Sequence, residues 1–119
     1  MEPWMERMNA WLSGEIALCE ERRAALAADA REDEAVFEKI RANVYGIFRT
    51  ILFAAQHACE NGENAQRFCE DKLEQIPEKW TAAYEEAKRH GDISRMVMES
   101  IKLDTARKIR ETLMREVRR

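Results

Sequence analysis

The sequence predicts an all-α protein, an up-down antiparallel four-helix bundle, and three observations lead to this prediction. Only four Gly and two Pro occur in 119 residues, and helix-favouring Ala, Glu, Arg and Leu predominate. Apolar side chains recur at steps of three and four residues, which is the spacing of one helix face. Breaks in this pattern fall at even intervals, and short links between segments of near-equal length place neighbouring helices antiparallel.

The first two predicted helices span residues 3–28 and 33–60, and the break between them is the least marked. No Gly or Pro lies there, but Asp29 and Glu32 have the spacing of a capping box, and Asp33 could cap the second helix instead. An uninterrupted helix over both segments would be unusually long. The alternative is that the two helices are continuous, so that a three-helix protomer completes its core by dimerisation.

The third predicted helix spans residues 64–90. Either Asn61 or Gly62 can take the left-handed conformation that ends the second helix, and Asn64 can cap the third. Pro77 lies inside the third segment, where its ring removes one backbone hydrogen bond and crowds the preceding turn. We therefore expect a kink or a restart of the helix just before Pro77.

The fourth predicted helix spans residues 92–119, with Gly91 ending the third helix and Asp92 capping the fourth. The four segments together predict a single helical-bundle domain over residues 1–119, a length that can bury one core without disulfides or metal. No internal repeat is visible in the sequence.

Composition restricts the classes of function. Apolar residues make up 45% of the chain and charged residues 36%, with a formal net charge of −3, so the chain is neither disordered nor a polyanion binder by bulk charge. Three cysteines make no disulfide framework, which favours reduced thiols and a cytoplasmic location. The most apolar run, residues 42–59, is interrupted by polar side chains, and we expect no association with membranes.

Sites for catalysis or for a cofactor are not evident. His57, Cys59 and Cys69 could bring soft ligands together, but their spacing does not fit a zinc site, and a fourth ligand is missing. Neither His57 nor His90 follows a Glu by three residues, as a di-iron bundle requires. Glycine-rich phosphate loops are also absent. We therefore expect no cofactor, no metal and no enzymatic activity.

The second helix offers a candidate interface. Gly46, Thr50, Phe53 and His57 form one line along the face opposite the apolar stripe, and this face carries few charges. A large aromatic residue in that position favours a homodimer seam, with burial by neighbouring helices as the other interpretation. The leading hypothesis is accordingly a non-enzymatic, self-associating interaction or structural module whose protein partner the sequence does not identify.

Two other functions are open. The last segment is the only basic part of the chain, and a basic helix can bind the phosphates of nucleic acid. Acidic residues interleave with its bases and favour a salt-bridged, solvated face instead. The third idea is a small-ligand pocket lined by Trp11, Phe48 and Trp80. The basic residues in question are Lys102, Arg107, Lys108, Arg110 and Arg115.

Overall fold

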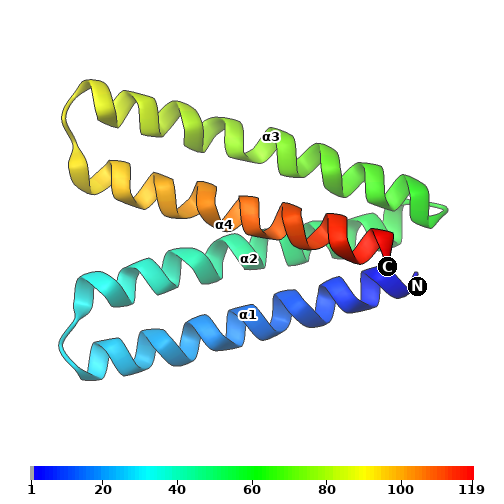
Figure 1. The fold of residues 1–119 in the computed structure, drawn as a ribbon, viewed down its shortest axis with the longest axis horizontal. Coiled ribbons are helices and arrows are strands. Elements are labelled where there is room, and N and C mark those ends of the chain that lie inside the picture. The colour runs from blue at the N-terminus through cyan, green and yellow to red at the C-terminus, as the bar shows by residue number, and fades with distance from the viewer. Residues whose placement is uncertain (1) are drawn as a thin grey trace.

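The computed structural model describes residues 2–119 and shows four helices, with no strand among these residues (Figure 1). They are α1 (Pro3–Ala28), α2 (Glu32–Ala58), α3 (Gly62–Arg89) and α4 (Ile93–Arg118). The predicted all-α, up-down four-helix bundle is confirmed. The bounds of α1 are the predicted ones, and those of the other helices differ by one or two residues. Because a turn separates α1 from α2, the alternative of one continuous helix with a core completed by dimerisation is wrong.

The turn between α1 and α2 closes without a side-chain cap. Asp29 ends α1, and Ala30 adopts the left-handed conformation with φ of 57°. The N–H of Arg31 then donates to the Leu26 carbonyl at 2.9 Å, and that of Ala30 donates to the Ala27 carbonyl at 3.1 Å. This is the backbone pattern of a Schellman turn. The predicted caps by Asp29 or Asp33 are wrong, because Asp29 is the residue at which α1 ends, Asp33 lies inside α2, and Arg31 takes the N-cap position without a side-chain hydrogen bond.

The link between α2 and α3 also differs from the prediction. Cys59 is extended, and Gly62 is the first residue of α3 instead of the left-handed end of α2. The cap of α3 is the Asn61 side chain, which accepts a hydrogen bond from the backbone N–H of Asn64 at 2.8 Å. Asn64 is thus the residue that is capped, because an N-cap oxygen reaches the N–H three residues further on.

The turn between α3 and α4 agrees with the sequence. Gly91 has φ of 68°, and the Asp92 carboxylate accepts from the backbone N–H of Arg95 at 3.1 Å. Inside α3, Pro77 does not end the helix, which continues from Gly62 to Arg89. The expected restart before Pro77 therefore does not occur. Within residues 2–119, no helix is both long enough and apolar enough to cross a membrane.

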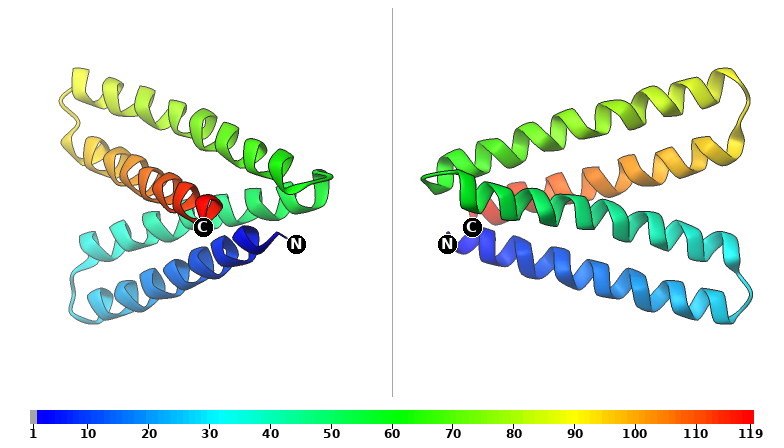
Figure 2. Two further views of the ribbon diagram at one scale, coloured as in Figure 1. Left: turned by 45° about the vertical axis from the view of Figure 1, so that its right-hand side comes forward. Right: turned by 180° about the vertical axis from the view of Figure 1, so that it is seen from behind.

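The four helices form two hairpins, α1–α2 and α3–α4, that lie side by side and point in the same direction (Figures 1 and 2). Both hairpin turns lie at one end, where the hairpins diverge, which we call the open end. At the other end, the joined end, the α2–α3 link lies close to the two chain termini (Figure 1). Helices α2 and α4 pack against each other and against both remaining helices, whereas the backbones of α1 and α3 do not approach each other closely within residues 2–119.

The hydrophobic core lies mainly in the joined half of the bundle, where all four helices contribute to it. Leu12, Ile109 and Leu113 are among its most deeply buried side chains, each 2% exposed or less. Large apolar side chains nearer the open end, such as Val36 and Val97, remain 45% and 37% exposed. Divergence of the hairpins explains this difference, because it withdraws the second hairpin from these positions (Figure 2).

The two hairpins correspond residue by residue at an offset of 61 positions. Both turns use the same backbone pattern, with Ala30 and Gly91 in the left-handed conformation. Burial follows the same register in both hairpins, as the following pairs show: Met8 and Cys69, Leu12 and Leu73, Tyr45 and Ala106, Phe48 and Ile109, Leu52 and Leu113. Few such pairs are identical, which is why the sequence alone shows no repeat.

One charged pair also recurs at this offset. Glu38 and Glu99 are buried glutamates, 8% and 7% exposed, and each binds a base three residues further along its helix. Glu38 accepts from Arg41 at 2.9 Å, and Glu99 accepts from Lys102 at 3.0 Å. The second carboxylate oxygen of both glutamates has no hydrogen-bond partner among residues 2–119.

Candidate interaction surfaces

The four residues predicted to form an interface lie along the outer side of α2, and we call them the α2 seam: Gly46, Thr50, Phe53 and His57. Phe53 is 63% exposed, whereas Phe48 on the opposite side of the same helix is 4% exposed. Thr50 and His57 are also exposed, and Gly46 is half-buried. No neighbouring helix covers this line of residues, so burial within the bundle does not account for Phe53.

Contacts within the α2 seam hold its side chains in place. The Phe53 and His57 rings are tilted against each other, with centroids 4.2 Å apart. The Thr50 hydroxyl donates to the Gly46 carbonyl at 3.1 Å, so this polar group already has a partner inside α2. A Cβ built on Gly46 would meet no atom within 4 Å, which leaves the space above this residue open. The seam therefore combines a protruding aromatic pair with a flat, open stretch of backbone.

A shallow hollow of about 270 Å³ lies beside Phe53 and is lined by Asn9, Arg49, Thr50 and Phe53. Asn9 comes from α1, so this hollow follows the groove between α1 and α2. Arg49 is held at its edge, where Nη1 donates to the Ser13 hydroxyl at 3.5 Å. Asn9 and Ser13 could not be predicted as neighbours of the α2 seam, because only the pairing of α1 with α2 brings them beside Phe53 and Arg49.

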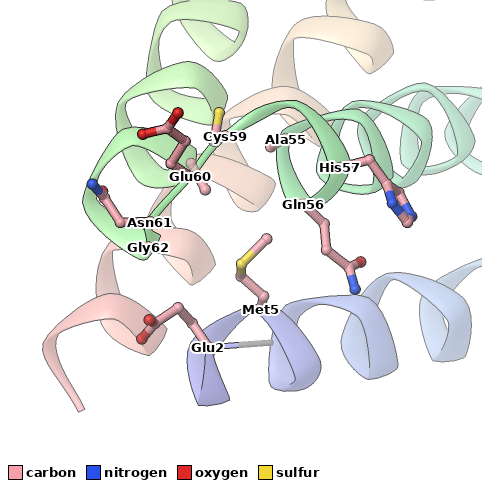
Figure 3. A pocket seen from close by; sticks show the side chains of 10 residues that line it. Glu2, Met5, Ala55, Gln56, His57, Cys59, Glu60, Asn61 and Gly62 are labelled. Carbon is pink, nitrogen blue, oxygen red and sulfur yellow. The ribbon is translucent and has the colours of Figure 1, made fainter.

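The second hollow, about 400 Å³, lies at the joined end (Figure 3). Its buried floor includes Met5 and Ala65, and Met5 projects from α1 toward the α2–α3 link (Figure 3). Gln56 reaches from α2 toward α1 in the same view, and His57 also lines this hollow. The Phe53–His57 pair therefore forms a ridge, because Phe53 borders the first hollow and His57 borders the second.

The three cysteines are free thiols and differ in exposure. Cys19 and Cys69 are buried, whereas Cys59 is half-buried in the wall of the second hollow. Burial, together with the nearby Glu38 carboxylate, raises the pKa of Cys19 to about 11. Burial also raises the pKa of Cys69 to about 12. Both groups therefore remain neutral thiols at physiological pH. Residues 2–119 contain no group of three or more potential metal ligands placed to hold an ion.

The predicted basic residues of α4 are distributed around the helix and mostly paired. Lys102 binds Glu99 at 3.0 Å, and Lys108 lies 3.7 Å from Glu15 of α1. Arg107 binds both Asp104 and Glu111, at 2.6 and 2.8 Å. Arg115 donates to the Thr112 hydroxyl, and Arg110 is exposed. At 100° per residue these five bases point in several directions, so they do not present one continuous surface to a phosphate backbone.

The aromatic residues of the predicted ligand pocket are not gathered around one large cavity. Phe48 lines an apolar void of about 20 Å³ inside the core, and neither Trp11 nor Trp80 borders that void. Trp11 instead packs edge-on against Tyr45, with ring centroids 5.6 Å apart. A void of this volume is far smaller than the pockets that hold small organic ligands.

The α2 seam with its two flanking hollows is the surface that best fits a partner. It holds an aromatic side chain that is 63% exposed, Phe53, and hollows border the Phe53–His57 pair on both sides. Only three charged side chains line these hollows: Glu2, Arg49 and Glu60. No family model matches this chain, and no curated protein and no solved structure matches it either.

Proposed function

We propose that the protein is a non-enzymatic, cytoplasmic helical-bundle module that associates with itself through the α2 seam. The observation that carries this proposal is the 63% exposure of Phe53 beside an open hollow. Exposed aromatic side chains next to concave surfaces are the usual anchors of protein interfaces. In a two-fold dimer, the Phe53 ring of each protomer would occupy the hollow beside Phe53 of the other.

Chemical features of the seam support this arrangement. Gly46 has no side chain, and space is open above it, so two copies of α2 can approach closely at this point. The Thr50 hydroxyl already donates within its own helix, so burial against a partner leaves no unpaired donor. A typical interface covers about 800 Å² on each partner, which is about a tenth of the 7446 Å² accessible surface of this protein.

The test is the mass of the protein in solution at about 1 M salt, where screening suppresses contacts between copies that depend on charge. The mass is measured by light scattering after gel filtration over a range of concentrations. We expect the wild type to approach twice the 13.9 kDa chain mass and the Phe53→Glu variant to remain at 13.9 kDa with unchanged helical content. Glutamate at this position would bring two carboxylates together and leave them desolvated at the interface.

The matched control is Leu18→Glu, which places the same charge on a 37% exposed leucine of α1, away from the seam. This variant should associate as the wild type does. At this salt concentration, a wild type that remains at the one-chain mass at every protein concentration would refute the proposal. A Phe53→Glu variant that still forms dimers at about 1 M salt would exclude the α2 seam as the contact.

A further inference from the structure

The two hairpin turns at the open end carry opposite charge. Residues 29–34, which we call the acidic tip, hold four acids and one base, with formal charge −3. Residues 88–95, the basic tip, hold three bases and one acid, with formal charge +2. The sign inverts directly at two equivalent positions at the offset of 61, because Arg31 corresponds to Asp92 and Glu34 corresponds to Arg95. The other charged residues of the two tips have no charged equivalent. Two turns of the same backbone geometry thus differ in the sign of their charges.

Some charged side chains on each tip make no ion pair within the described part of the chain. In the acidic tip, Arg31 binds Glu34 and lies 4.0 Å from Asp29, but Glu32 and Asp33 make no ion pair among residues 2–119. In the basic tip, none of the three bases makes an ion pair among residues 2–119, and all three are exposed: Lys88, Arg89 and Arg95. Both tips therefore present unpaired charge to solvent.

Exposed apolar side chains lie beside these charges. Ile93 in the basic tip is 72% exposed, the largest value among the large apolar residues of the described chain. Val36, just after the acidic tip, is 45% exposed, and Val97, its equivalent at the offset of 61, is 37% exposed. An apolar centre with charges around it is the usual composition of a protein interface.

The two tips of one molecule do not satisfy each other. The hairpins diverge toward the open end, so the tips lie apart in both views (Figures 1 and 2). Ion pairs within residues 29–34 are the only ones that involve either tip among residues 2–119. Each tip therefore lacks a partner of opposite charge within its own molecule. A second copy of the chain carries such a partner, because its other tip has the opposite charge.

We propose that the open end is a second interface, in which the acidic tip of one copy binds the basic tip of another. A two-fold arrangement satisfies both tips of both copies at once, because the acidic tip of each then meets the basic tip of the other. Ile93 and Val36 would pack at its centre. This contact is independent of the α2 seam, so a chain whose seam is disrupted should still form it.

The experiment uses charge reversal in the Phe53→Glu chain at about 0.01 M salt, which isolates the open end from the α2 seam and leaves charge contacts unscreened. Glu32→Lys/Asp33→Lys makes both tips basic, and Lys88→Glu/Arg89→Glu makes both tips acidic. We expect each double variant alone to show the one-chain mass in sedimentation velocity and an equimolar mixture to regain the two-chain mass. A control, Glu74→Lys/Glu78→Lys, applies the same charge change in the middle of α3 and should leave association intact.

The parent Phe53→Glu chain should itself form a salt-sensitive dimer. Raising the salt from about 0.01 M to about 1 M shortens the screening length from about 30 Å to about 3 Å, which should weaken the association at least about tenfold. The proposal is overturned if the parent stays at the one-chain mass at low salt. The same result would be found if the two tips of one molecule bound each other, and it would exclude a contact between copies in either case. A mixture of the two reversed variants that stays monomeric overturns it as well.

Charge reversal at these positions also weakens the ends of α2 and α3, so circular dichroism should accompany each measurement. Ile93→Ser provides a variant that alters no charge and removes the most exposed apolar side chain of the tips. In the Phe53→Glu chain this variant should weaken the dimer several-fold while the salt dependence persists. An unchanged association constant would exclude Ile93, and with it the open end, as the contact.

Discussion

The substitution Leu12→Ala tests whether the joined end holds the fold together. Leu12 is 1% exposed and lines the core void with Phe48, Leu113 and residues of α3. Loss of three buried carbon groups costs about 2.4 kcal/mol at about 0.8 kcal/mol for each group. The space left behind adds a cavity cost and brings the total to about 3–4 kcal/mol, within the range known for buried leucines.

The matched comparison is Leu18→Ala on the same helix, two turns nearer the open end. Leu18 is 37% exposed, so less apolar surface returns to water, and solvent can fill the space. We expect a cost of about 1.5 kcal/mol or less at such a site. Both free-energy costs should be measured by urea unfolding in the Phe53→Glu chain. A low protein concentration is needed so that association does not contribute to the apparent stability.

With a slope of about 1.5 kcal/mol per molar urea, Leu12→Ala should lower the unfolding midpoint by about 2 M and Leu18→Ala by about 1 M or less. The slope itself should stay constant, which would show that the denatured state is unchanged. Equal losses for the two variants would refute the reasoning, because the free energy of unfolding would then not be concentrated where all four helices meet.

Two further predictions follow from Gly and Cys residues. Gly14→Ala and Gly46→Ala should each stabilise the monomer by about 0.5–1 kcal/mol in urea unfolding, because a Cβ meets no atom within 4 Å at either helical site. Only Gly46→Ala should also weaken the dimer formed through the α2 seam. Because burial raises the pKa of Cys19 and Cys69 from 9.0 to about 11 and about 12, the folded protein holds two protons that the unfolded chain releases above pH 9. Stability should therefore fall as pH rises from 9 toward 12, by up to about 1.4 kcal/mol per pH unit for each thiol. A Cys19→Ala/Cys69→Ala variant should lack this part of the slope, and an identical slope would contradict it.

The sequence is sufficient to predict the fold class because helix periodicity and turn residues are local signals. Gly91 and Asp92 act within their own turn, so their roles could be predicted without the tertiary structure. The turn at Ala30 was harder to predict, because alanine rarely adopts a positive φ and carries no side-chain signal for it. The break itself was predicted from the capping spacing of Asp29 and Glu32 and from the unusual length that one uninterrupted helix would have.

The candidate surfaces could be predicted only in part. Phe53 lies opposite the apolar stripe of its own helix, which favours its exposure, but only the arrangement of the neighbouring helices shows that none of them covers it. Asn9 and Ser13, which complete the surroundings of the seam, come from another helix, and their position depends on the pairing of α1 with α2. The divergence of the hairpins was not predicted, because it depends on how side chains from all four helices pack together. The complementary tips were therefore missed as well.

The uneven distribution of buried side chains also has a consequence for the dynamics of the molecule. A helix segment near Ala30 or Gly91 rests mainly against the other arm of its own hairpin, and it can unwind without disturbing the interior near Leu12. Amide hydrogens should then exchange with deuterium in a graded order, earliest beside the two turns and latest around Leu113, although nearly all of them lie in regular helix. Local unfolding would thus start from the two loops, and the segments that open first are those that carry the unpaired charges.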